Sequence, residues 1–140
     1  MNMMVNQLDA DLFLKLYISV GWEPPCREQV ERALENTFAS FVAYDGDIPA
    51  GMVRVIGDGG MSFYIKDFAI RPEYQSRGIG KLLITSAEQY IRESIGPWAV
   101  SLELISTIEA QGFYEKRGFE PRPCAWDGPG MFKMIRQQEK

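Results

Sequence analysis

The chain has 140 residues, a hydrophobic fraction of 46% and a formal charge of −4, which predict one domain, residues 1–140, around one core. The acidic balance without a basic cluster argues against nucleic-acid binding, because such a surface needs positive charge to neutralise phosphates. No apolar run reaches the length of a membrane span and residues 1–6 lack the pattern of a signal peptide, so we expect no membrane partner.

The thiol and titratable side chains narrow the chemistry further. Cys26 and Cys124 are far apart in the sequence and lack metal-ligand spacing, so we expect free thiols, a reducing cytoplasmic location and no metal. The chain contains no histidine. Acid–base catalysis would therefore have to use carboxylates, tyrosine, cysteine, lysine, the backbone or water.

Two helices are predicted first. Asp9 or Asp11 is suited to cap an amphipathic helix, and Gly21 ends it. A second helix is predicted over residues 27–37, after a proline-containing loop. A short additional strand before the first helix also fits the pattern.

A meander of three antiparallel strands comes next. Residues 38–44 form a nearly continuous apolar run, residues 51–56 form the returning strand, and residues 61–70 form the third strand. Asp45-Gly46-Asp47 is a hairpin turn signal, and residues 57–60 make the second turn.

The second half of the chain alternates between helices and strands. A helix is predicted over residues 78–94, a strand over 98–104 and a short helix over 109–117. A strand is expected to begin at Phe119, and residues 131–136 alternate as a last strand. The order of elements predicts an α/β layer fold with a mixed sheet.

A glycine-containing turn joins the third strand to the helix that follows it. Arg71-Pro72 stops the strand, because proline lacks an amide hydrogen and restricts the residue before it. Gln75-Ser76-Arg77-Gly78-Ile79-Gly80 then opens the helix. The first amides of a helix have no partners and carry partial positive charge, and glycine leaves the backbone open to a ligand. The turn is therefore suited to bind a phosphate or pyrophosphate.

The spacing separates several kinds of phosphate loop. A P-loop needs Ser or Thr after Gly-Lys, but Leu82 follows Lys81. A dinucleotide fingerprint needs a third glycine where Leu83 stands. A turn with glycines for tight packing and no ligand is also compatible with Gly-x-Gly alone. The remaining pattern is Gln/Arg-x-x-Gly-x-Gly/Ala, which Gln75, Gly78 and Gly80 match.

A second motif lies one helix and one strand further on. Ala110, Phe113, Tyr114, Gly118 and Phe119 fit the pattern Ala-x-x-Phe-Tyr-x-x-x-Gly-Phe. Together the two motifs resemble those of the GNAT superfamily of acetyl-CoA-dependent N-acetyltransferases, and the order of elements resembles that fold over nearly the whole chain. The resemblance implies an α/β GNAT fold with a mixed, mostly antiparallel central sheet that is flanked by helices and splayed at the cofactor site.

The resemblance also implies where acetyl-CoA binds. The glycine turn would hold the pyrophosphate, and the pantetheine arm would pair with the end of the third meander strand. An amide there, that of Ile70 or of Phe68, would polarise the thioester carbonyl. The cofactor-binding residues implied in this way are Phe68, Ala69, Ile70, Gln75, Ser76, Arg77, Gly78, Ile79, Gly80, Lys81 and Tyr114. Thr107 stands where the family often has asparagine, so its contact with the cofactor is left open.

Three side chains are candidates for catalysis. By resemblance, Tyr114 would protonate the departing thiolate, and a phenol with an ordinary pKa of about 10 is protonated at neutral pH. Asp67 on the third meander strand and Glu103 on the facing strand could hold the ammonium ion and pass its proton to water. A surface or capping role for these two carboxylates is an equal alternative.

The acceptor site would be built from the first two helices, their loop and the last hairpin. Tyr17, Trp22, Phe41 and Trp126 could supply an aromatic wall that attracts an ammonium ion. We expect acetyl transfer to a primary amine of a small molecule by direct attack. A non-catalytic acyl-CoA-binding module, acetylation of a protein or peptide amine, and an unrelated structural domain are the alternatives. The resemblance is also compatible with a homodimer.

Overall fold

The computed structural model describes residues 1–137 and divides the chain into two compact units, Met1–Leu104 and Ile105–Lys140. The first unit holds a five-stranded sheet in the order β1-β2-β3-β4-β5. The division reflects where contacts concentrate along the chain, so the single domain of residues 1–140 stays a prediction.

The sheet is mixed and mostly antiparallel, as expected. Its strands are β1 (Asn2–Val5), β2 (Ala39–Asp45), β3 (Ile48–Gly57), β4 (Ser62–Ile70) and β5 (Ser101–Glu103). The first four pair antiparallel, and β5 pairs parallel with β4. The short strand that was compatible with the N-terminal pattern is therefore present as β1, and the hairpin at Asp45-Gly46-Asp47 joins β2 to β3.

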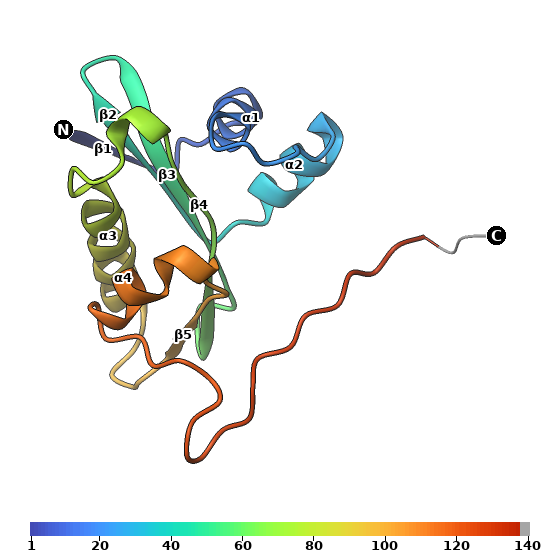
Figure 1. Cartoon of the computed structure of the whole chain (residues 1–140), viewed down its shortest axis with the longest axis vertical. Coiled ribbons are helices and arrows are strands. Elements are labelled where there is room, and N and C mark those ends of the chain that lie inside the picture. Colours follow the sequence, from blue (N-terminus) through green and yellow to red (C-terminus); the bar gives the residue numbers. More distant parts are fainter. Residues whose placement is uncertain (138–140) are drawn as a thin grey trace. The chain divides into compact units, whose positions relative to one another are not determined.

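Three helices cover the sheet of the first unit. Helices α1 (Ala10–Ser19) and α2 (Arg27–Glu35) lie on one face, and α3 (Ile79–Ser94) lies on the other (Figure 1). The Asp9 side chain caps α1 by accepting a hydrogen bond of 2.9 Å from the Leu12 amide. Of the two predicted caps, Asp9 is therefore correct, while Asp11 lies in the first turn of the helix.

Each face of the sheet has its own core. On the α1/α2 face, Val42, Met52 and Ala69 pack against the buried side of α1. On the α3 face, Phe63 packs edge-on against Phe38, which packs in turn against Tyr90 of α3. Because side chains alternate between the faces of a strand, the strand residues that face α1 and α2 can be told apart from those that face α3.

Two predicted elements are shorter than expected. The strand predicted over residues 98–104 is confined to Ser101–Glu103. Trp98 lies in a bend before it and donates its indole N–H to the Gly60 carbonyl at 3.1 Å. The helix predicted over residues 109–117 consists of a 3₁₀ turn, Ile108–Ala110, and α4 (Gln111–Glu115).

The second unit ends α4 as the sequence indicates. Gly118 has φ +90°, and its amide donates to the Glu115 carbonyl while the Phe119 amide donates to the Tyr114 carbonyl. These two bonds form a Schellman motif, which requires a left-handed residue at the position of the glycine.

The two strands predicted after α4 are wrong for the part of the chain that the structure describes. Residues 119–137 contain no helix or strand there, and apolar side chains in this segment are exposed, such as Met131 (87%) and Ile135 (88%). Alternation shows that a segment is suited to a half-buried strand, but a strand forms only where a neighbouring strand offers hydrogen-bond partners.

No helix within residues 1–137 is both long and apolar enough to cross a membrane.

Candidate active site

The strands β4 and β5 stay together only at one end. Ser62, Phe63 and Tyr64 pair with Ser101, Leu102 and Glu103, in that order. From Ile65 to Ile70, β4 continues with no β5 partner among the described residues. The expected splay is therefore present: within the first unit, no strand pairs with this side of β4 directly before the glycine turn. We call residues 65–70 the open edge of β4.

A β-bulge lies within the open edge. Arg54 pairs with Lys66, but Met52 pairs with Ala69, so two residues of β4 oppose the single residue Val53. The bulge contains Asp67, which has a φ of +53°, a conformation uncommon for residues other than glycine. The extra residue shifts which side chains and amides of β4 face each side.

The bulge turns the Ile70 amide toward the open edge. The Arg71 amide donates to the Ala50 carbonyl at 2.9 Å, so this pair is hydrogen-bonded across β3 and β4. Bonded and non-bonded pairs alternate along an antiparallel ladder, so the Ile70 pair with Gly51 is non-bonded. The Ile70 N–H therefore points away from β3. Ile70 is one of the two residues whose amides are predicted to polarise the thioester; the other, Phe68, lies within the bulge, where the alternation is interrupted.

The glycine turn presents the start of α3 to solvent. Ser76 and Gly78 both have positive φ values, +63° and +82°. Gly78 is the N-cap of α3 and no side chain caps the helix there. The first backbone bond into the helix runs from the Leu82 amide to the Gly78 carbonyl at 3.1 Å. The amides before Leu82 are thus the unpartnered amides of a helix N-terminus, which favour an anion.

Contacts from neighbouring elements support the turn. Gln75 donates its side-chain amide to the Ile70 carbonyl at 3.0 Å. Tyr74 is buried and donates its hydroxyl to the Asp45 carboxylate at 2.9 Å, which ties the turn to the β2–β3 hairpin. This hydrogen bond, with burial and the charge of Asp45, raises the pKa of the Tyr74 phenol. The Arg77 guanidinium lies 5.2 Å from the centre of the Tyr74 ring.

The remaining side chains predicted for the turn lie at its surface or in the helix. Ser76, Arg77 and Lys81 are exposed, and Ile79 and Gly80 are buried against the sheet. Exposed cations at this position suit contact with phosphate oxygens.

The two candidate carboxylates share the α1/α2 face of the sheet. Glu103 is exposed and lies opposite Tyr64, where β4 and β5 separate. Asp67 accepts a hydrogen bond of 2.8 Å from Arg54 Nε, and both side chains of this ion pair are only 11% exposed. The predicted pair is therefore on one face, but the two carboxylates differ sharply in exposure.

Of the aromatic residues predicted for the acceptor, Trp126 belongs to the second unit and is exposed, and the other three divide between the two faces of the sheet. Tyr17 packs edge-on against Trp22, with ring centres 5.1 Å apart, on the α1/α2 face. Burial raises the pKa of the Tyr17 phenol, and the negative charge of Asp67 raises it further. The prediction for Phe41 is wrong, because Phe41 is 1% exposed and packs against Tyr90 of α3. A continuous apolar strand gives no signal of which face each residue occupies.

Tyr114 belongs to the second unit, and its ring packs edge-on against two neighbours. Its centre lies 5.3 Å from that of Phe113 and 5.7 Å from that of Phe119. Burial raises the pKa of the Tyr114 phenol, which keeps the hydroxyl protonated over a wider pH range. Thr107 is exposed and precedes the 3₁₀ turn.

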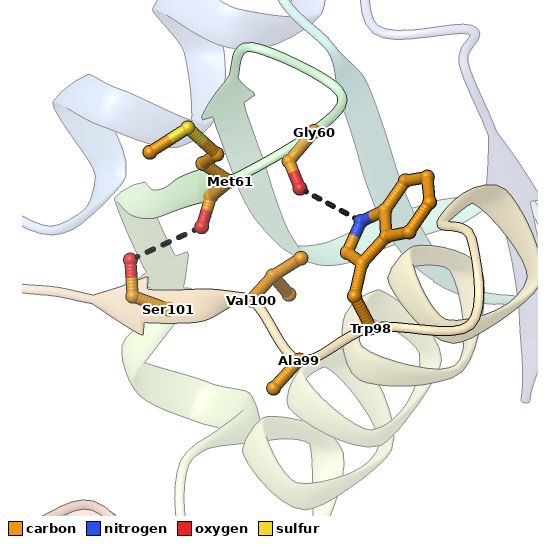
Figure 2. Close-up of a pocket in the computed structure, with 6 residues that line it drawn as sticks. All are labelled: Gly60, Met61, Trp98, Ala99, Val100 and Ser101. Carbon is orange, nitrogen blue, oxygen red and sulfur yellow. Dashed lines mark hydrogen bonds between the residues drawn. The ribbon is translucent and has the colours of Figure 1, made fainter.

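A pocket of about 580 Å³ lies at the other end of β4. Gly60, Met61, Trp98, Ala99, Val100 and Ser101 line it (Figure 2). The Trp98 indole bonds to the Gly60 carbonyl on one side, and the Ser101 hydroxyl lies 3.5 Å from the Met61 carbonyl on the other. These residues precede β4 and begin β5, whereas the glycine turn follows the far end of β4, so this pocket is separate from the candidate site.

Sequence reasoning missed two residues that support the site. Arg54 reads as a single cation in an apolar strand, and only the register places it beside Asp67. Tyr74 reads as part of the turn, and its partner Asp45 lies 29 residues earlier. The sequence signals were a charged residue within an apolar strand for Arg54 and an aromatic residue within a polar turn for Tyr74. Residues 1–137 hold no cluster of three or more His, Cys, Asp or Glu that could bind a metal ion.

Comparison with known proteins identifies the family. The family described as "Acetyltransferase (GNAT) domain" matches residues 18–134. GCN5-related N-acetyltransferase 1, chloroplastic, of Arabidopsis thaliana is 29% identical over 94% of this chain and 64% of its own length. The uncharacterized N-acetyltransferase ycf52 of Gracilaria tenuistipitata var. liui is 30% identical over 94% of this chain and 70% of its own length.

A solved structure agrees with the sequence comparison. A Staphylococcus aureus protein described as a "Probable Acetyltransferase" is 32% identical, with a TM-score of 0.83 over 96% of this chain and 98% of its own. The chain therefore belongs to the GNAT family of N-acetyltransferases and has its α/β fold. It spans about two thirds of the length of the Arabidopsis relative.

Proposed function

We propose that this protein transfers the acetyl group of acetyl-CoA to the primary amine of a small molecule by direct nucleophilic attack. The single observation that carries the proposal is the open edge of β4, which runs straight into an uncapped helix N-terminus. An unpaired strand edge can bond to an extended amide-containing chain, and a helix N-terminus can hold a pyrophosphate. CoA contains both an extended amide-containing chain and a pyrophosphate, joined one after the other.

The donor would be held by groups of the first unit. In this proposal, the pyrophosphate binds the amides of residues 76–81, with Arg77 and Lys81 as exposed cations near its oxygens. The pantetheine arm extends along Phe68, Ala69 and Ile70. Bound acetyl-CoA supplies an electrophilic thioester, and the Ile70 N–H donates to its carbonyl oxygen as negative charge develops there.

Proton transfer would use the carboxylates and Tyr114. The amine must lose a proton to attack, after which a carbon–nitrogen bond forms, the carbon–sulfur bond breaks and the thiolate takes up a proton. Glu103 is the better placed proton acceptor, because it is exposed and can pass the proton to water. Asp67 lies on the same face in its ion pair with Arg54. We assign protonation of the thiolate to Tyr114 on the basis of its motif and its raised pKa.

The acceptor site in this proposal lies on the α1/α2 face. Tyr17 and Trp22 offer partly exposed aromatic surface there, and Glu103 adds an exposed negative charge on the same face. Both features attract an ammonium ion. A small primary amine fits this chemistry.

An amine panel tests the function. CoA-thiol release from acetyl-CoA is measured over small primary amines, polyamines, amino acids and peptide N-termini, with mass spectrometry of the products. We expect acetylation of at least one small amine. Preferred acetylation of peptides would replace the acceptor class, and tight CoA binding without turnover would favour a non-catalytic acyl-CoA-binding module.

Assembly and location are also proposals. We propose a homodimer in the cytoplasm, where two free cysteines such as Cys26 and Cys124 stay reduced. Light scattering after size exclusion checks the assembly, and a monomer at micromolar concentration would contradict it. Microscopy of a tagged protein in its native cell checks the location.

A further inference from the structure

An arginine stacks on the motif that carries Tyr114. The guanidinium carbon of Arg117 lies over the Phe113 ring, 4.4 Å from its centre. Arg117 Nη1 also donates to the Phe113 carbonyl at 3.5 Å, so one side chain contacts both the ring and the backbone of Phe113. A planar guanidinium suits this position, because it stacks on an aromatic face and is attracted by its electrons.

The Arg117 side chain keeps this position at a cost. Its Nε is buried and has no hydrogen-bond partner among residues 1–137. A buried donor without a partner loses free energy that water would otherwise supply. Arg117 would avoid this loss by extending into solvent, where the neighbouring Lys116 lies exposed. The stack on Phe113 therefore determines where this guanidinium lies.

Phe113 transmits the contact to Tyr114. The Tyr114 ring meets the Phe113 ring at 81° and the Phe119 ring at 79°, so it is packed edge-on between two neighbours. Edge-to-face packing is a favoured arrangement of aromatic pairs. A shift of the Phe113 ring would change the packing that fixes the plane of the Tyr114 ring, and with it the direction of the hydroxyl.

The backbone around Tyr114 depends on the same residue. Helix α4 has only five residues, which is too short to be stable by itself. The Tyr114 carbonyl accepts hydrogen bonds from the amides of Arg117 at 2.9 Å and Phe119 at 3.2 Å. Arg117 thus contacts the motif twice, through its amide at Tyr114 and through its side chain at Phe113.

We propose that Arg117 is a positioning residue that stacks on Phe113 and thereby fixes the direction of the Tyr114 hydroxyl, which protonates the departing thiolate. This inference rests on the proposed function and deepens it. The catalytic group is the Tyr114 hydroxyl, and the Arg117 side chain acts on it only through the Phe113 ring. Burial raises the pKa of the Tyr114 phenol, whereas a cation close to the hydroxyl would lower it, so Arg117 acts through its planar face and not through its charge.

Three single variants and one double variant separate this role from general destabilisation. Arg117→Ala removes the stack, and Arg117→Lys keeps the charge and the aliphatic stem without the planar face. Lys116→Ala is the matched control, because Lys116 is the preceding residue of the same turn, carries the same charge and is exposed. Arg117→Ala combined with Tyr114→Phe tests whether the effect of Arg117 passes through the Tyr114 hydroxyl.

Single-turnover acetyl transfer to an amine identified in the panel measures the effect on the chemical step. Arg117→Ala lowers the rate constant about tenfold, while the Kd for acetyl-CoA stays within about twofold, because the hydroxyl is misdirected and the donor site is intact. Arg117→Lys loses nearly as much, and Lys116→Ala keeps the wild-type rate. In Tyr114→Phe protein, Arg117→Ala causes less than about a twofold further loss, because the hydroxyl it positions is already gone.

Spectra of protein with ¹³C-labelled tyrosine rings test the packing without any activity. The Tyr114 signals are identified by their loss in Tyr114→Phe, and the two edge-on rings displace them by ring currents. We expect these signals to move toward those of free tyrosine in both Arg117 variants and to stay in place in Lys116→Ala. Arg117→Lys carries the test if Arg117→Ala does not fold.

Several results would overturn the proposal. They are a wild-type rate in Arg117→Ala or Arg117→Lys, an undiminished loss of rate when Arg117→Ala is added to Tyr114→Phe, and Tyr114 signals that move in neither Arg117 variant. A wild type that acetylates no amine would overturn the proposed function, while the spectra would still show whether Arg117 holds Tyr114.

Discussion

The anion site at the glycine turn can be tested with a charge placed at Gly78 and a matched control at Gly21. Both glycines have nearly the same left-handed φ, +82° and +84°, and an added Cβ would meet no atom within 4 Å at either position. Gly78 caps α3 at the proposed pyrophosphate site, whereas Gly21 follows α1. Aspartate at either position has the same backbone cost in folding, but the helix dipole favours it at the start of α3 and disfavours it at the end of α1. Only Gly78→Asp should affect CoA binding.

The structure sets the size of each effect. An aspartate held at positive φ costs roughly 1 kcal/mol, equivalent to roughly 3 °C in melting temperature for a chain of this length. A carboxylate about 5 Å from one phosphate charge costs about 0.8 kcal/mol with the dielectric constant of water and about 3 kcal/mol with an effective value of 20. Gly78→Asp should therefore weaken CoA binding between about fourfold and about 150-fold per phosphate charge.

Isothermal titration with CoA, paired with thermal melting of the free proteins, measures both quantities. We expect a melting temperature for Gly78→Asp at or above that of Gly21→Asp, and weaker CoA binding in Gly78→Asp alone. Added salt should narrow the difference, because the repulsion is screened. Equal CoA affinity in the two variants would refute the assignment of the pyrophosphate site to the turn.

Three further predictions concern single side chains. Tyr114→Phe should lower the single-turnover rate about 100-fold with little change in acetyl-CoA affinity. Because the pKa of the wild-type Tyr114 phenol is raised, the wild-type rate should not fall on the alkaline side until above pH 10. An unchanged rate in the variant would reduce Tyr114 to a packing role. Tyr74→Phe removes the hydroxyl that is hydrogen-bonded to Asp45 and so loosens the turn. Calorimetric titration should show CoA binding weakened about threefold to tenfold. Unaltered affinity would argue that the hydrogen bond to the hairpin is dispensable. Asp58 accepts amide hydrogen bonds from Met61, Gly60 and Ser62, which lower the pKa of its carboxyl, so its stabilising contribution is present above the ordinary pKa of 3.8 and is lost as the pH falls through the lower folded-state value. Asp58→Ala should thus reduce the melting temperature more at pH 7 than at pH 3, and an equal loss at both pH values would count against this assignment.

Local signals were sufficient for the elements that are determined locally. Gly118 adopts the left-handed conformation that its place after α4 requires, and Gly78 adopts a left-handed conformation at the start of α3. Asp9 caps α1, and the hairpin after Asp45 forms where the turn signal stands. In each of these cases the deciding interaction joins residues that are close in the sequence.

The bulge and the C-terminal segment show where local reasoning fails. Residues 61–70 read as one regular strand, and nothing near Asp67 marks the extra residue, because its partner Arg54 is fixed by the register between β3 and β4. Residues 131–136 alternate like a strand, but pairing depends on a distant partner. Phe41 was placed on the wrong face because a fully buried strand has no polar side to identify its orientation.

The map of backbone amide shifts on titration with acetyl-CoA tests the central claim most directly. In ¹⁵N-labelled protein, we expect the largest changes at Ile70 and at the amides of residues 76–81, which form the open end of β4 and the helix N-terminus. The apolar pocket at the opposite end of β4 provides an internal comparison. Shifts confined to Gly60, Met61 and residues 98–101, or no shifts at millimolar acetyl-CoA, would contradict the account.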